Sequence, residues 1–107
     1  MSNLPTYRIK ESTLKDFADS LLKEGYAVQC TKEQSLLRNE KTLYREWLIE
    51  DKKGVKVIFW DKCSVADEPE GRQCIVTIGS PGGRRGKNLL TSSIEILKRA
   101  GAVELYK

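Results

Sequence analysis

Apolar residues recur along the chain at helical and at strand spacing, which predicts an α+β fold. The first helical stripe supports a helix over residues 12–24 and consists of Leu14, Phe17, Ala18, Leu21 and Leu22. A second stripe near the C-terminus consists of Leu90, Ile94 and Leu97. Ser12 and Asn88 are suitable N-caps for these helices, and Gly25 and Gly101 are suitable C-terminal stops.

Alternating apolar and polar residues predict strands between and beside the helices. These strands cover residues 6–10, 26–31, 42–50, 55–61, 72–78 and 102–106. The turn signal Asp51-Lys52-Lys53-Gly54 joins two of them into the clearest hairpin of the sequence. Residues 32–41 fit either a short strand around Leu36 and Leu37 or an irregular turn.

The resulting order of elements is β-α-β-(β)-β-β-β-α-β. It predicts a mixed, mainly antiparallel sheet with two helices packed on one face, because right-handed crossovers from similar strands place helices on the same side. A length of 107 residues corresponds to a single α+β domain over 1–107.

Composition indicates a well-solvated globular protein. Charged residues make up 32% and hydrophobic residues 39% of the chain, and no apolar run approaches the roughly 20 residues of a membrane span. The N-terminus lacks the apolar core of a secretory signal, so we expect a cytoplasmic protein without membrane contact.

The three cysteines suggest neither a disulfide framework nor a metal site. Their number is odd, and no pair has the C-x-x-C spacing of a zinc site. Cys30 and Cys74 lie in strand-like runs, so we expect them to be small buried groups, and Cys63 to be the accessible cysteine.

The chain contains no histidine. This excludes Ser-His-Asp and Cys-His catalysis and His-ligated zinc, and it lowers the expectation of an enzyme. Acidic pairs such as Glu50-Asp51 and Asp67-Glu68 fall in predicted turns, where carboxylates commonly solvate the chain. We predict no cofactor.

The net charge of +4 is concentrated near the C-terminus. Residues 1–83 are balanced, and the excess lies in residues 84–107, which carry Arg84, Arg85, Lys87, Lys98, Arg99 and Lys107. A glycine-rich segment between a predicted strand and a predicted helix holds the first three of these cations. Its candidate anion-binding residues are Gly82, Gly83, Arg84, Arg85, Gly86, Lys87 and Asn88. Free backbone N–H groups, a helix N-terminus and clustered cations suit phosphate, although a solvated connecting loop explains the same composition.

Two named phosphate motifs do not fit this segment, because Pro81 stands where a Walker A loop and a dinucleotide-binding loop each require glycine. The run from Gly83 to Leu90 resembles the coenzyme-A pyrophosphate loop of the GNAT acetyltransferases. That family has Gln or Arg where Gly83 stands and Gly or Ala where Asn88 stands. The resemblance covers about the last quarter of the chain and implies pyrophosphate binding.

Aromatic residues cluster in the predicted hairpin. Tyr44 and Trp47 must face opposite sides of the sheet, as must Phe59 and Trp60. The candidate surface aromatics are Tyr44, Trp47 and Trp60, which with Arg45, Lys56 or Lys62 nearby would suit base stacking on single-stranded nucleic acid. Alternatively, one tryptophan belongs to the core and the other covers an apolar patch or a dimer contact.

We therefore expect a small non-catalytic binding protein whose basic loop binds phosphate groups or nucleic acid. The first alternative is a protein-interaction domain, such as an adaptor, an inhibitor or an immunity-type protein of a phage or mobile element, whose loop meets an acidic protein surface. The second is a small histidine-free ribonuclease or a reduced acyltransferase. An exposed edge strand or an aromatic outer sheet face would permit a homodimer.

Overall fold

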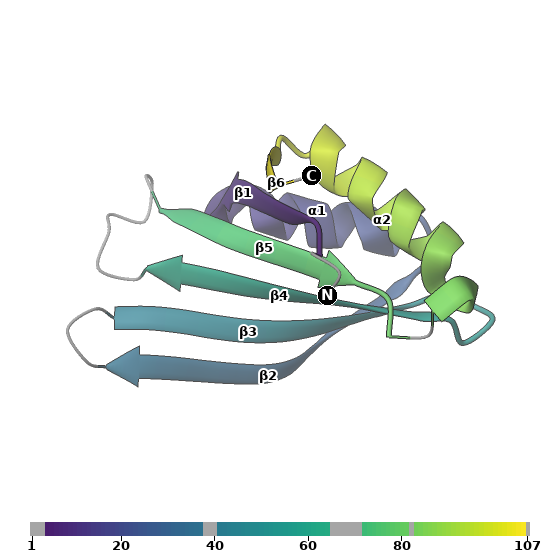
Figure 1. The fold of residues 1–107 in the computed structure, drawn as a ribbon, viewed down its shortest axis with the longest axis horizontal. Coiled ribbons are helices and arrows are strands. Elements are labelled where there is room, and N and C mark those ends of the chain that lie inside the picture. The colour runs from purple at the N-terminus through teal and green to yellow at the C-terminus, as the bar shows by residue number, and fades with distance from the viewer. Residues whose placement is uncertain (1–3, 38–40, 65–71, 82, 107) are drawn as a thin grey trace.

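The computed structural model describes residues 4–37, 41–64, 72–81 and 83–106, and this part of the chain forms a six-stranded sheet with two helices on one face (Figure 1). The strands are β1 (Thr6–Lys10), β2 (Ala27–Leu37), β3 (Lys41–Glu50), β4 (Lys56–Ser64), β5 (Gln73–Gly79) and β6 (Val103–Tyr106). The helices are α1 (Glu11–Lys23) and α2 (Lys87–Arg99), and a short 3-10 helix (Gly83–Gly86) leads into α2. The predicted α+β class is confirmed.

The strand order across the sheet is β2-β3-β4-β5-β1-β6, and every pairing between described strands is antiparallel. Each helix joins two strands that run in the same direction but are not neighbours. Three strands separate β1 from β2, and β1 itself lies between β5 and β6. The helical crossovers therefore add no parallel pair to the described sheet. The sequence predicted a mixed, mainly antiparallel sheet, whereas the pairings of the described strands are all antiparallel.

Both helices begin slightly earlier than predicted. Helix α1 starts at Glu11, so Ser12 lies inside it and does not cap it. Its first residue is held by Arg72, whose carbonyl accepts from the Glu11 N–H at 3.1 Å and whose guanidinium lies 3.2 Å from the Glu11 carboxylate. Helix α2 starts at Lys87, which places Asn88 in the first turn and gives Gly86 the capping position.

The predicted helix ends are confirmed at two glycines. Gly25 and Gly101 have φ angles of 92° and 105°, in the left-handed region that favours glycine after a helix. The ambiguous stretch after residue 31 belongs to β2 as far as Leu37, with a register shift between Cys30 and Lys32. Residues 38–40 lie outside the described part of the chain.

One hydrophobic core lies between the helices and the sheet. Its fully buried aromatic residues are Tyr7, Phe17 and Phe59, and the rings of Phe17 and Phe59 meet edge to face with centroids 5.3 Å apart. In the part of the chain that the structure covers, no helix is long and apolar enough to cross a membrane.

Cys74 is buried in a strand, as predicted, but the predictions for Cys30 and Cys63 and the expected absence of a disulfide were wrong. Cys63 and Cys74 are directly opposite each other on β4 and β5, are fully buried and form a disulfide, whereas Cys30 is exposed and free. Sequence spacing does not reveal a pair of this kind, because the two cysteines come together through strand register. The sequence did contain a signal that Cys63 is buried. Every second residue of β4 faces the core, so Cys63 shares a face with Phe59 and Asp61.

Candidate nucleic-acid interface

The glycine-rich basic segment runs from the end of β5 directly into α2. Arg84, Arg85, Lys87 and Asn88 are exposed, whereas Gly86 is buried. Gly83 begins the 3-10 helix, and Gly82 lies outside the described residues. The described part of the predicted anion site therefore forms a short ordered turn with its cations pointing into solvent, at the N-terminus of a helix.

Gly86 lets this turn approach strand β4 closely. A Cβ atom added to Gly86 would overlap the Ser80 hydroxyl, come within 2.9 Å of the Ser80 Cβ atom and lie 3.3 Å from the Lys56 carbonyl oxygen. The Gly86 backbone angles, φ −87° and ψ −3°, are accessible to other residues, so the requirement for glycine is one of space. This packing places Arg85 next to the hairpin turn between β3 and β4.

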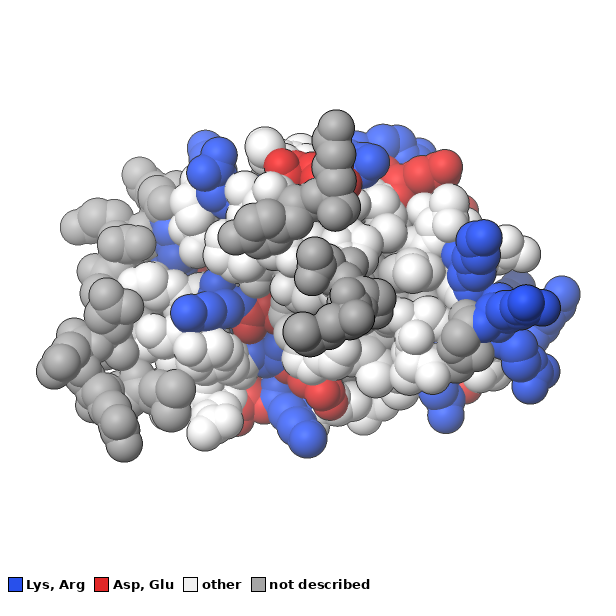
Figure 2. Space-filling view, viewed as in Figure 1, with Lys and Arg blue, Asp and Glu red and all other residues white. Residues whose placement is uncertain are grey.

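Two clefts form where the basic turn meets that hairpin. The first, of about 340 Å³, has three cationic residues in its lining, namely Lys53, Lys56 and Arg85. The second shares Lys53 and Arg85 with it and adds Lys52 and Asn88. Lysine and arginine side chains gather at this end of the molecule, on the right in Figure 2. The cations come from two segments, the hairpin turn with the start of β4 and the basic turn with the start of α2. We call these residues together the basic end: Lys52, Lys53, Lys56, Arg84, Arg85 and Lys87.

Two carboxylates lie near the basic end, and one of them accepts hydrogen bonds from the backbone. Asp51 accepts hydrogen bonds at 2.9 Å from the backbone N–H groups of Lys53 and Val55, so it stabilises the hairpin turn. Glu24 lines the second cleft beside Asp51. The first cleft, in contrast, has no acidic side chain among its described lining residues.

Sequence reasoning identified half of the basic end. The turn Asp51-Lys52-Lys53-Gly54 was recognised as a hairpin signal, but its lysines could not be assigned to the same site as Arg84 and Arg85. Lys98 and Arg99, which contribute to the same excess charge, lie at the opposite end of α2. A helix of 13 residues is about 20 Å long, so these two cations do not belong to the basic end.

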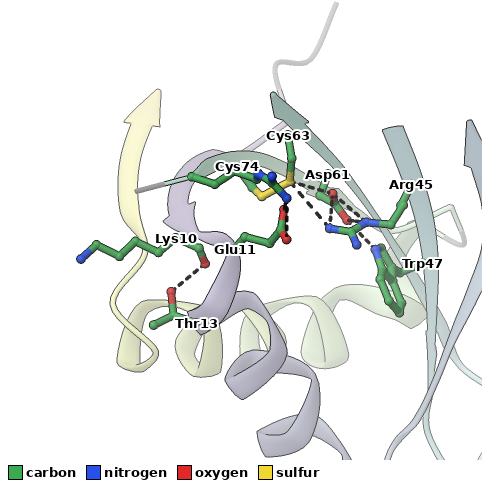
Figure 3. The surroundings of a disulfide bond; sticks show 9 residues. Lys10, Glu11, Thr13, Arg45, Trp47, Asp61, Cys63 and Cys74 are labelled. Carbon is green, nitrogen blue, oxygen red and sulfur yellow. Dashed lines mark hydrogen bonds and ion pairs between the residues drawn. A yellow bond between two sulfur atoms is a disulfide. The ribbon is translucent and has the colours of Figure 1, made fainter. Parts of the chain in front are cut away.

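The candidate aromatic residues are divided between the two faces of the sheet. Tyr44 and Trp60 lie on the face away from the helices, which we call the open face, whereas Trp47 faces the helices. The Trp47 ring stacks on Phe59 with centroids 5.6 Å apart, and it lines a cleft of about 500 Å³ against α1. Its indole Nε1 donates to Asp61 at 2.6 Å (Figure 3).

Trp60 is the more exposed tryptophan, with 38% of its surface accessible. Its indole Nε1 donates to Glu46 at 2.9 Å, and Glu46 also accepts from the Thr31 hydroxyl at 2.9 Å. These two hydrogen bonds favour the ionised carboxylate and lower the pKa of Glu46. Next to this group, the Lys62 ammonium lies 5.6 Å from the centre of the Tyr44 ring, within cation–π range.

Arg45 does not join the open face. It points toward the helix side, where it binds Asp61 next to the disulfide (Figure 3). Glu11 is also close, because its carboxylate and the sulfur atoms of Cys63 and Cys74 lie within 4.8 Å of one another. Both sulfur atoms are bonded to each other, so they are not thiolate ligands, and this cluster offers a metal ion a single carboxylate.

Comparison of the chain with protein-family models, with curated proteins and with solved structures finds no match. The function is therefore inferred from the site alone.

Proposed function

We propose that this protein binds the phosphate groups of nucleic acid at its basic end and that it acts by binding rather than by catalysis. The observation that carries the proposal is the cleft in which Lys53 and Lys56 of one segment meet Arg85 of another. The two segments are about thirty residues apart in the sequence and contact each other through the close approach at Gly86.

Each component of the basic end suits a phosphate oxygen. Arginine presents a planar fork of donors, and lysine supplies a compact point charge. The N-terminus of α2 adds a partial positive charge at Lys87, and its first turn contains no acidic residue. The clustered charge would draw a polyanion to this end of the molecule by diffusion, in a manner that salt weakens.

The alternative ligand is an acidic protein surface, because carboxylates and phosphates attract the same cations. Nucleic acid is favoured because the open face of the sheet carries aromatic and cationic residues. This face includes Lys56, the first residue of β4, which also belongs to the basic end. An acidic partner remains a distinguishable outcome of the experiment below.

The test is oligonucleotide binding measured by fluorescence anisotropy as a function of salt. The variant R84Q/R85Q removes two cations from the basic end, and K98Q/R99Q removes two from the far end of the same helix as a matched control. We expect the logarithmic salt slope to fall by about 1 to 2 in R84Q/R85Q, since each lost phosphate contact removes about 0.7–0.9. The control should retain the original slope.

Equal behaviour of the two variants would contradict the proposal, because it would show that the location of the charge is irrelevant. Absence of binding to any oligonucleotide at low salt would also contradict it. A pull-down that recovers an acidic protein in stoichiometric amount would assign the basic end to a protein partner instead, if two conditions hold. The association must withstand nuclease treatment, and it must be lost in R84Q/R85Q.

A further inference from the structure

We propose that the ligand is single-stranded nucleic acid whose bases stack on the open face of the sheet, on Trp60 and Tyr44. This inference rests on the proposed function, in which the basic end holds phosphate groups. It adds the strandedness of the ligand and a second contact surface, which the basic end alone does not determine.

Strand register places aromatic and cationic residues in two adjacent rows across the open face. In one row, Arg8, Ile75, Lys62 and Tyr44 are successive partners on β1, β5, β4 and β3. In the next row, Thr77, Trp60, Glu46 and Lys32 are successive partners on β5, β4, β3 and β2. Trp60 and Tyr44 are therefore diagonal neighbours, and each row contains an aromatic ring and at least one cation.

The two rings differ in how they are held. The hydrogen bond to Glu46 fixes the orientation of the Trp60 indole and leaves it partly exposed to solvent. The Tyr44 ring is partly exposed and lies near the Lys62 ammonium, a cation that can contact a phosphate beside a stacked base. An orientation fixed before binding reduces the entropy lost when a base stacks.

The charges of the open face complement a phosphate backbone. Among the described residues, this face presents Arg8, Lys10, Lys32, Lys56 and Lys62 against Glu46 and Glu50. Lys56 also lines the cleft of the basic end. Lys56 therefore connects the basic end with the open face. A single nucleic-acid strand could cross both surfaces and keep its phosphates near cations throughout.

A single strand fits this face better than a duplex or a second copy of the chain. Trp60 and its exposed apolar neighbour Ile75 offer ring and side-chain surface, which unpaired bases can cover and paired bases cannot. In a twofold dimer through this face, a surface with a net positive charge would meet a copy of itself, and like charges across an interface are unfavourable.

The experiment uses the tryptophan content of the chain. Its two tryptophans are Trp47 and Trp60, so the variant W47F reports on Trp60 alone. Phenylalanine preserves an aromatic ring beside Phe59 but removes the donor to Asp61, so the folding of W47F is checked by circular dichroism. Oligo-dT and oligo-U are titrated into W47F at low salt, with a duplex of the same length as the comparison. We expect the single strands to quench Trp60 fluorescence in a saturable manner and the duplex to leave it nearly unchanged.

Binding by variants measures the contribution of each ring. W60L and Y44L keep apolar side chains on the sheet, and their folding is checked by circular dichroism. We expect single-strand affinity to fall about 5- to 100-fold in each variant, as for other base–aromatic contacts. Duplex affinity, which depends on the basic end, should change less than twofold. The matched control K15Q removes a cation on the helix side and should leave both affinities unchanged.

The outcomes separate the two proposals. Absence of binding to every oligonucleotide overturns both of them. Salt-sensitive binding that requires Arg84 and Arg85, combined with a silent Trp60 and an unchanged affinity in W60L, overturns this inference and leaves the proposed function intact. A concentration-dependent dimer that W60L abolishes would also overturn it, by assigning the open face to a second copy of the chain.

Discussion

Arg45 holds the carboxylate of Asp61 from two of its nitrogen atoms, across the boundary between β3 and β4. The guanidinium Nε lies 3.1 Å from both carboxylate oxygens, and Nη2 lies 3.0 Å from Oδ1. The two residues are direct cross-strand partners, and the Asp61 side chain is 0% exposed. Together with the indole of Trp47, Arg45 thus satisfies a carboxylate that is fully removed from water (Figure 3).

The loss of one partner of this ion pair should destabilise the fold strongly. Removing one partner of a buried pair leaves the other charge uncompensated, so R45M should lower the free energy of unfolding by about 3 kcal/mol. The double variant R45M/D61L should recover most of the loss, because no buried charge remains. Urea denaturation followed by circular dichroism measures both, and a loss below about 1 kcal/mol in R45M would contradict the account.

The disulfide makes a prediction about thiol reactivity. Under non-reducing denaturing conditions, a thiol assay should detect one cysteine per chain, Cys30, and complete reduction should reveal all three. In the folded protein, partial desolvation of the thiol by neighbouring atoms and the negative charge of Glu33 raise the pKa of Cys30. Its alkylation at neutral pH should therefore be slow for an exposed cysteine. Detection of three thiols without reductant would contradict the disulfide.

Loss of the disulfide should lower stability by a predictable amount. The bond closes a loop with a sequence separation of 11 residues. Loop-closure entropy for such a length corresponds to about 3 kcal/mol at 25 °C. The variant C63A/C74A should therefore melt about 10 to 20 °C below the oxidised protein in a calorimetric scan. The variant C30S, which leaves the bond intact, is the control and should melt close to the original protein.

The hydrogen bonds of Glu46 predict a pH dependence of Trp60. Because these bonds lower the pKa of Glu46, its carboxylate stays ionised to a lower pH than an ordinary glutamate. The stabilisation is therefore present above the pKa of the unfolded chain and is lost as the pH falls through the lower pKa of the folded state. Trp60 fluorescence in W47F should change at that pH. The variant E46Q should remove this transition, and a transition that persists in E46Q would point to another group.

Local pattern was sufficient for the elements and for the class of fold. Leu14, Phe17 and Leu21 of the first apolar stripe are buried where the periodicity indicated, whereas Leu22 is exposed. The glycines that end both helices also lie where they were predicted. The sequence also separated the faces of Tyr44 and Trp47, because strand residues an odd number of positions apart must point to opposite sides.

Pairing between distant segments was not predictable in the same way. The disulfide depends on the register that sets Cys63 opposite Cys74, and the basic end depends on the packing of the β3–β4 turn against the segment before α2. Neither relationship produces a spacing signal along the chain. The position of Arg45 on the helix side was missed because a charged residue in an amphipathic strand is ordinarily expected on the solvent side. Its buried partner Asp61 became visible only with the strand register.

Gly86 links the stability of the basic end to its binding. In G86A the new methyl group would overlap the Ser80 side chain, while the backbone angles remain acceptable for alanine. We expect a loss of about 1–3 kcal/mol, the usual cost of overpacking, and weaker oligonucleotide binding as Arg85 moves away from Lys56. Urea denaturation and anisotropy measure the two effects.

The same contact provides its own control, because the Ser80 side chain can be removed. In the background of S80G, the overlap disappears and the Lys56 carbonyl oxygen remains 3.3 Å from the added methyl group, a distance that a small backbone adjustment relieves. The G86A substitution should therefore cost much less in S80G than in the original chain, in both stability and binding. Equal costs in the two backgrounds would show that the contact with Ser80 is not the reason for glycine, and that the basic turn does not depend on this close approach.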